Sequence, residues 1–418
     1  MFRSHGKAQQ ILLIILLVVI SVETGAASDS DALAISQNIQ ILHMPFGTIL
    51  DPVFASSDPA SPNYSQIVRY TRAGDSAIWT GHYLAAEAFR YGATRSSEAL
   101  SNTKQALAGV HALLDVTGND LLARCLVPVD SPYLAAIQKE EAGHGIYYNK
   151  LKGRDYFWIG NTSRDQYSGV MFGLGVAYDL IDDANMRNVI RGDVTRVLNY
   201  LLAHSWNVVM PDGRISTTFL HRPDQMLSFL QVGRRVNPQK FGSTYTAYRS
   251  VYASSVALPI YFDNLDEHDS YFKFNLNYIN LYNLIRLEED SSTYKTLYTH
   301  AYDKLRQRTQ LHGNAHFNML DRDLKRADAG HDTATVLLLQ LWLQRPRRDY
   351  WIDLRGKYAA CGADRACSPI PVNERVNTDF LWQRSPFLLF GGGFGTIETA
   401  AIDYILPYWM ARRDGLNP

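Results

Sequence analysis

The chain has 418 residues, of which 46% are hydrophobic and 20% are charged, so it carries ample material for a folded core. Lys and Arg total 41, and Asp and Glu also total 41, so the chain has no basic surplus with which to neutralise nucleic-acid phosphates. These numbers exclude extensive disorder and argue against a nucleic-acid partner.

The N-terminus has the pattern of an export signal. Arg3 and Lys7 precede an apolar run over 11–20, and small residues follow over 24–28. The run is shorter than the roughly 20 apolar residues that a spanning helix needs. We therefore expect a cleaved signal peptide over 1–27 and a secreted or periplasmic protein. The alternative is an uncleaved anchor, which would be the chain's one contact with a membrane.

The remaining chain divides into an arm and one large domain. Residues 28–70 contain several prolines, which predict an extended, irregular N-terminal arm. Residues 71–418 show helical periodicity, and strand alternation with hairpin turns is sparse, so the predicted fold class is all-α. The expected helices, mostly in hairpin pairs, are about 75–89 with 98–116, 166–182 with 186–204, 223–232 with 244–260, 270–288 with 292–309, and then 332–344 and 397–412.

One local design occurs twice in this domain. A polar, aromatic loop runs into a helix rich in Gly and Ala, first over 72–89 and again over 157–178. Small residues let helices pack at close range, and each loop places an Asp beside a helix N-terminus. We expect segments 81–88 and 169–177 to lie in an inner ring of helices, with the loops before them forming a pocket at one end.

Residues 70–345 resemble the six-hairpin glycosidase-like, or (α/α)6 toroid, superfamily. The marks of the resemblance are the segment 75–89, the helix ending Val116-Thr117-Gly118 and the segment 158–165. The chain looks most similar to secreted bacterial members with no assigned activity. The resemblance implies a (α/α)6 toroid built from helical hairpins. It also implies a sugar site at the mouth of the barrel, where such proteins often use acidic residues from loops at inner-helix ends.

Asp75 and Asp165 occupy equivalent positions in the two copies and are the predicted catalytic residues. A glycosidase needs two carboxyl groups facing one cleft, one protonated as general acid and one ionised as base or nucleophile. The alternative is that each Asp only caps its helix, which would also keep its pKa low.

Neighbouring aromatic and cationic side chains are the predicted substrate-binding residues. Trp79 and Trp158 offer stacking surfaces, and His82 with Tyr83 follows one helical turn after Trp79. Arg164 can grip the carboxylate of an acidic sugar or pair with Asp165. For His82 the alternative is a packed core histidine that satisfies one hydrogen bond.

Two further histidines and the cysteines complete the candidates. His221 and His331 lie in polar segments near helix starts and are added to the substrate-binding set. Cys361 and Cys367 fit a short disulfide in an exported protein, which leaves Cys125 as a buried thiol. No zinc, calcium or nucleotide motif has the required spacing, so neither a metal nor a cofactor is expected.

Three functions remain open from the sequence. The first is an exported glycoside hydrolase that uses the paired Asp residues. The second is a polysaccharide lyase, or another toroid lyase or isomerase, in which His and Tyr transfer the proton and Arg neutralises a uronate. The third is a non-catalytic glycan-binding protein of the cell envelope. The expected partner is in each case a glycan or a small-molecule substrate.

Overall fold

The computed structural model describes residues 28–57, 66–266, 268 and 270–418, and the expected signal peptide over 1–27 lies outside these residues. The chain is 58% helix and 13% strand. The helices of the described residues are α1 Asp29–Asn38, α2 Ser76–Thr94, α3 Ser97–Asp115, α4 Leu134–Glu140, α5 Arg164–Leu180, α6 Ala184–Ala203, α7 Pro223–Val236, α8 Pro238–Tyr252, α9 Ala257–Asp263, α10 Phe272–Arg286, α11 Thr293–Thr309, α12 Ala315–Lys325, α13 Ala329–Leu343 and α14 Ile402–Arg413.

The prediction of an all-α toroid is wrong, because the described residues also form three antiparallel sheets and the fold is mixed α/β. One sheet has the strand order β2-β1-β9-β8, a second β3-β5-β4, and a third β6-β7. The strands are β1 Asp51–Phe54, β2 Ile67–Thr71, β3 Cys125–Pro128, β4 Ile146–Leu151, β5 Arg154–Ile159, β6 Asn207–Val209, β7 Ile215–Thr218, β8 Arg348–Asp353 and β9 Phe390–Glu398.

The N-terminal arm is also more regular than predicted. Residues 28–70 contain α1, a π-helical turn over Ile39–His43, and the strands β1 and β2. β1 pairs with β2 and, through Val53 and Ile397, with β9 from the other end of the chain. The pairing of β1 with β9 involves no local turn, so it leaves no signal in the nearby sequence. The sequence pattern therefore predicted an irregular segment.

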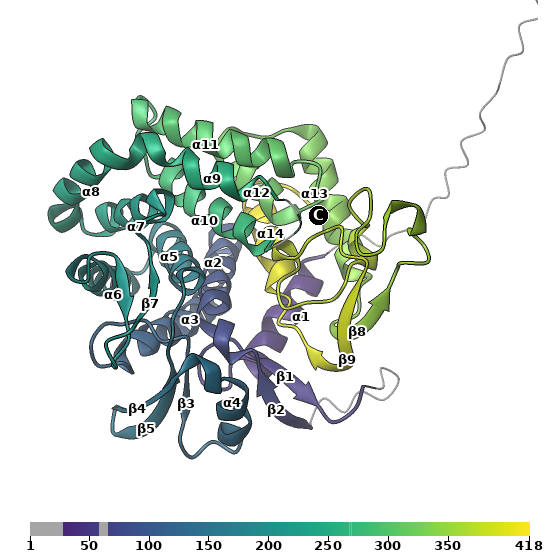
Figure 1. Ribbon diagram of the computed structural model, residues 1–418, viewed down its shortest axis with the longest axis horizontal. Coiled ribbons are helices and arrows are strands. Elements are labelled where there is room, and N and C mark those ends of the chain that lie inside the picture. The colour runs from purple at the N-terminus through teal and green to yellow at the C-terminus, as the bar shows by residue number, and fades with distance from the viewer. Residues whose placement is uncertain (1–27, 58–65, 267, 269) are drawn as a thin grey trace, which may run out of the picture.

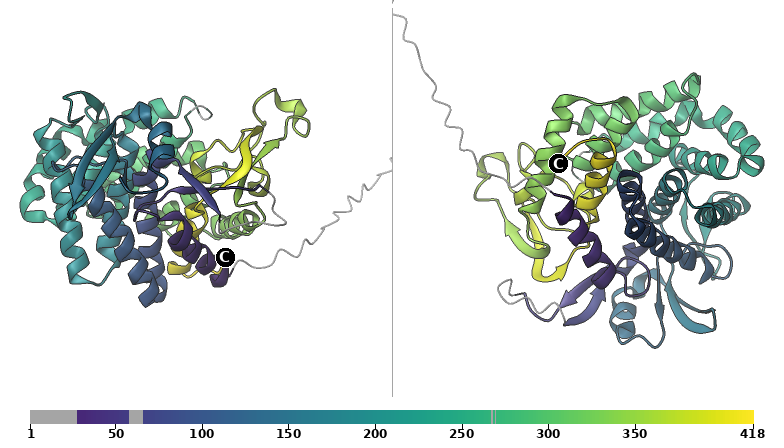
Figure 2. Two further views of the ribbon diagram at one scale, coloured as in Figure 1. Left: turned by 90° about the horizontal axis from the view of Figure 1, so that it is seen from below. Right: turned by 180° about the vertical axis from the view of Figure 1, so that it is seen from behind.

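Six helices contact one another in a closed order around the core, namely α2, α5, α7, α10, α12 and α14, with α14 returning to α2 (Figure 1). Strand pairs stand in the connections before four of them: β1/β2 before α2, β4/β5 before α5, β6/β7 before α7 and β8/β9 before α14. The sheets accordingly lie toward one side of the helical body (Figure 2). The segments that the sequence predicted as polar loops are therefore partly short hairpins.

The close approach of α2 and α5 follows from their glycines. A Cβ atom on Gly81 would lie 2.2 Å from the carbonyl oxygen of Gly169, and one on Gly173 would lie 2.2 Å from that of Gly81. Any larger residue would force the two backbones apart. The small residues thus set the distance between α2 and α5, and with it the distance between the loops that precede them.

Candidate active site

A cavity of about 220 Å³ lies where the starts of α2, α5 and α10 meet the 3-10 turn η7, Leu381–Gln383. Two residues predicted as catalytic and one predicted as substrate-binding line it together. Its lining consists of Asp75, Ile78, Trp79, Asp165, Phe272, Gln383 and Arg384. Segments far apart in the chain therefore build one polar cleft with aromatic walls.

Neither acidic residue serves as a helix cap. Asp75 stands at the N-cap position of α2, but its side chain makes no capping hydrogen bond. The side chain of Gln166 takes that role, because its Oε1 accepts a hydrogen bond of 2.9 Å from the backbone N–H of Ile78. Asp165 lies within the first turn of α5 and does not cap it either. Both carboxyl groups are thus available to the cavity.

The same glutamine joins the two carboxyl groups. Its Nε2 donates to Oδ1 of Asp75 at 3.1 Å and to Oδ2 of Asp165 at 3.3 Å. Those two oxygens therefore lie no farther apart than the two distances together, about 6.4 Å. Gln166 is fully buried, so this bridge is held rigidly by the core.

The electrostatic surroundings of Asp75 favour its protonated form. Burial in the cleft, followed by the negative charges of Asp379 and Asp165, raises the pKa of Asp75 to about 6. The guanidinium of Arg124, 3.8 Å away, offsets only part of this effect. The side chain remains 41% exposed, so a ligand in the cavity can reach it.

Asp379, in the C-terminal segment, acts on Asp75. Burial disfavours its charge, but Arg72, Arg384 and hydrogen bonds from Thr378 and the Phe380 amide outweigh burial and hold its pKa below the ordinary value. Asp379 is therefore a buried negative charge behind the cavity. Gln383 links it to the cavity wall through a hydrogen bond of 3.4 Å.

Arg124 fixes the two Asp-bearing loops relative to each other. Its guanidinium donates to the carbonyl oxygens of Gly74 and Asn161 at 2.7 and 3.0 Å and to the hydroxyl of Ser163 at 2.7 Å. The Ser163 hydroxyl in turn donates to Oδ1 of Asp165. One buried cation thus orders both loops and orients the Asp165 carboxylate.

Two aromatic residues form the apolar part of the cleft. Trp79 stacks on Phe380 with ring centroids 4.9 Å apart and an angle of 18° between the planes. Phe272, the first residue of α10, is 46% exposed. The exposed ring of Phe272 can bind the C–H face of a sugar ring, whereas Trp79 is 5% exposed and one of its faces is covered by Phe380.

The other residues expected near the site lie elsewhere. His82 and Tyr83 are fully buried in the core. Nδ1 of His82 is 2.8 Å from the carbonyl oxygen of Ile78, and burial lowers the pKa of this imidazole to about 4. The hydroxyl of Tyr83 accepts a hydrogen bond from Gln40 at 2.7 Å. Both side chains are part of the buried core, and neither lines the cavity.

Trp158 and Arg164 precede Asp165 in the chain but do not line the cavity. Trp158 belongs to β5, is 2% exposed and stacks on Tyr147 at 4.5 Å. Arg164 begins α5 and donates to the carbonyl oxygen of Thr218 at 3.3 Å. Burial and the charge of Arg222 lower the pKa of this guanidinium.

His221 and His331 also lie outside the cavity that contains Asp75 and Asp165. His221 lines a separate groove of about 490 Å³ with residues of α9, including Phe262 and Asp263. His331 stands near the start of α13, with Nδ1 3.9 Å from carboxylate oxygens of both Asp321 and Asp328. Neither histidine lines the cavity with Asp75 and Asp165.

Sequence reasoning missed several residues of the site, namely Arg124, Gln166, Phe272, Asp379, Gln383 and Arg384. Gln166 directly follows Asp165, and its position in the first turn of a predicted helix was the available signal. Asp379, Gln383 and Arg384 belong to the long segment between two expected helices, where no periodic pattern indicates what the side chains contact.

The structure joins Cys361 and Cys367 in a disulfide, and Cys125 is a buried free thiol whose pKa burial raises to about 12. Among the described residues, no cluster of three or more His, Cys, Asp or Glu side chains has the arrangement of a metal site. No helix in the described part of the chain is both long and apolar enough to cross a bilayer.

Comparison of the chain with protein-family models, with curated proteins and with solved structures found no significant match.

Proposed function

We propose that this chain is an exported glycoside hydrolase in which Asp75 is the general acid and Asp165 is the nucleophile. The observation that carries the proposal is the bridge through Gln166, which holds the two carboxyl groups side by side in one cavity. Paired carboxyl groups in different environments are what glycosidic bond hydrolysis requires.

The assignment of roles follows from the surroundings of each group. With a pKa of about 6, Asp75 keeps its proton over a wider pH range than an ordinary Asp and can deliver it to the glycosidic oxygen. Asp165 is oriented by hydrogen bonds from Ser163 and Gln166. Asp165 lines the same cavity as Asp75.

The separation of the two groups favours a covalent mechanism. Retaining glycosidases hold their carboxyl groups roughly 5–5.5 Å apart, whereas inverting enzymes leave roughly 6.5–9.5 Å for a water molecule. The nearest carboxyl oxygens lie no more than about 6.4 Å apart, which is compatible with the closer arrangement, and the proposed covalent mechanism takes this arrangement.

In the first step Asp75 protonates the leaving oxygen while a carboxylate oxygen of Asp165 attacks the anomeric carbon, and the glycosidic bond breaks. In the second step the ionised Asp75 takes a proton from water, the water oxygen attacks the anomeric carbon, and the bond to Asp165 breaks. Both carboxyl groups return to their starting protonation states.

The aromatic walls and the lining composition fit this reaction better than elimination. Phe272 provides an exposed stacking surface for the sugar, and the largely buried Trp79 contributes apolar lining. A lyase needs a His or Tyr to take the proton, and none stands among the residues that line this cavity.

The test is a screen of the purified protein on neutral and acidic glycans, followed by analysis of the products. We expect new reducing ends whose anomeric configuration, read by NMR before mutarotation, is that of the substrate. Unsaturated products as the main products would replace the hydrolase by a lyase. Tight glycan binding without any turnover would leave only a binding protein.

A further inference from the structure

A second cavity adjoins the candidate active site. It measures about 260 Å³, close to the 220 Å³ of the first, and Arg384 stands in the walls of both. Its lining consists of Arg72, Asp349, Val376, Asn377, Thr378, Arg384, Leu388, Gly391 and Gly392. The two cavities therefore adjoin each other at Arg384.

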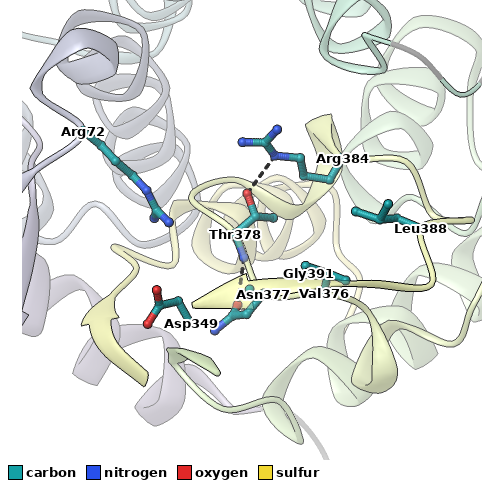
Figure 3. Close-up of a pocket in the computed structure, with 9 residues that line it drawn as sticks. Arg72, Asp349, Val376, Asn377, Thr378, Arg384, Leu388 and Gly391 are labelled. Carbon is teal, nitrogen blue, oxygen red and sulfur yellow. Dashed lines mark hydrogen bonds between the residues drawn. The ribbon is translucent and has the colours of Figure 1, made fainter. Parts of the chain in front are cut away.

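The walls of this second cavity are polar on one side and apolar on another. In Figure 3, Arg72 and Arg384 reach toward each other from opposite sides, with Thr378 between them and Asp349 below Arg72. Val376 and Leu388 add apolar surface. A sugar ring presents hydroxyl groups at its edge and C–H groups on its faces, and this combination of donors, an acceptor and apolar surface complements it.

Carboxylates outnumber guanidinium groups around the pocket. Arg72 pairs with Asp51 at 2.7 Å, and Arg384 lies 3.6 Å from Asp379. Asp349 brings a third carboxylate into the wall. Three carboxylates thus accompany two guanidinium groups, so the cavity has no surplus positive charge to attract an acidic ring. This charge distribution favours a neutral sugar over an acidic one.

The cavity is also pre-organised. Asn377 in its wall accepts from Arg345 at 3.1 Å and donates to the carbonyl oxygen of Pro346 at 2.9 Å. Arg384 is positioned by its hydrogen bond of 2.9 Å to the hydroxyl of Thr378. Groups that are fixed before binding lose little entropy when a ligand arrives.

We propose that this second cavity is a subsite for a neutral sugar ring next to the ring that is cleaved, so that the substrate is a chain of at least two neutral sugars. The inference rests on the proposed glycosidase function, since it takes the Asp75–Asp165 cavity as the place of cleavage. The shared Arg384 would contact both rings.

Equilibrium binding measurements test the proposed second subsite without requiring turnover. Calorimetry would use the full-length Asp165→Asn variant with glucose, mannose and galactose and with their β-linked disaccharides and trisaccharides. In at least one series we expect the affinity to rise roughly 10- to 100-fold from one ring to two, the effect of one added charge-assisted hydrogen bond.

Two further substitutions connect that gain to the second cavity. Leu388→Phe, made in the Asp165→Asn background, fills the cavity and should abolish the gain for the disaccharide while leaving monosaccharide binding unchanged. Leu337→Phe is the matched control, because Leu337 is 50% exposed on α13 and lines neither cavity. If Leu388→Phe does not fold, Arg384→Gln is a second test of the subsite. This variant should weaken disaccharide binding roughly tenfold or more.

The outcomes separate this inference from the proposed function. Equal affinity for one and two rings in every series, or a full gain retained in Leu388→Phe, would overturn the second subsite even if the protein hydrolyses glycans. A gain that depends on Leu388 would support the subsite even if no hydrolysis is found. At least tenfold tighter binding of digalacturonate than of galactobiose would contradict the neutral ring.

Discussion

Asp75 and Asp165 receive hydrogen bonds from the same nitrogen atom, Nε2 of Gln166, at 3.1 and 3.3 Å. The negative charge of Asp165 is also among the causes that raise the pKa of Asp75. The negative charge on Asp165 therefore favours the protonated form of Asp75.

Replacing either carboxyl group by an amide should remove activity and leave the fold intact. We expect Asp75→Asn and Asp165→Asn each to lower kcat on an identified glycan by about 10²- to 10⁴-fold. The melting temperature should change little, because neither side chain caps a helix. The exposed Asp212, which pairs with Arg214, offers Asp212→Asn as a matched control. Full activity in both site variants would remove the Asp pair from the mechanism.

The pH dependence should report the state of Asp75. Activity that needs the protonated acid falls as the pH rises through about 6. Because the like charge of Asp165 contributes to that raised value, Asp165→Asn should lower the pKa of Asp75. NMR titration of the Asp75 carboxyl carbon measures this shift without any substrate. An unchanged or higher pKa in the variant contradicts the coupling.

The free energy of unfolding should also depend on pH through the raised pKa of Asp75. The folded state holds the Asp75 proton up to about pH 6, whereas the unfolded chain releases it near the ordinary value of 3.8. Between these values the folded state binds more protons, so the contribution of Asp75 to stability falls as the pH rises through this window. Denaturant unfolding of the native protein and of Asp75→Asn from pH 4 to 7 measures the difference. A parallel pH dependence of the two proteins would speak against the raised pKa.

The bridging glutamine can be changed without losing its acceptor. In Gln166→Glu an oxygen can still accept from the Ile78 amide, but the donor to both acids is lost and a third carboxyl group is added. We expect the pKa of Asp75 to rise above its native value of about 6 and kcat to fall. Gln383→Glu is the comparison, because Gln383 lines the same cavity but donates to Asp379. A larger effect of Gln383→Glu on Asp75 would mean that the bridge is not the decisive contact.

The contact between α2 and α5 should tolerate no added methyl group. Gly81→Ala places a Cβ 2.2 Å from the carbonyl oxygen of Gly169 and should destabilise the protein by about 1–3 kcal/mol or more. Gly192 in α6 has no atom within 4 Å of such a Cβ, so Gly192→Ala should be neutral or stabilising by about 0.5–1 kcal/mol. Denaturant unfolding compares the two variants, and equal effects would disprove the close contact.

Local patterns determined much of the helical part of this protein. The spacing of apolar residues and the caps placed α5, α6, α10 and α11 within two residues of their observed ends, because helical hydrogen bonds join residues four apart and leave a local signal. The expected helix over 244–260 instead divides into α8 and α9. The recurrence of an Asp before a small-residue helix also indicated which two loops would meet.

The strands show where local patterns fail. The hairpin of β4 and β5 turns at Lys152 and Gly153, both with positive φ, a two-residue turn that its sequence only weakly indicates. The pairing of Val53 with Ile397 joins residues from opposite ends of the chain. A strand's partner is set by the fold, so no local window contains it.

The chemistry of the candidate site likewise depends on contacts between segments that are far apart in the chain. The sequence by itself supplied two Asp residues at helix starts, together with the Trp beside one of them. The tertiary structure shows that Gln166 caps α2 and that His82 is buried. It also shows that Asp379 and Arg384, from the C-terminal segment, lie near the Asp pair. Burial and charges from distant segments set the pKa of Asp75, and these are properties of packing that the order of residues along the chain does not contain.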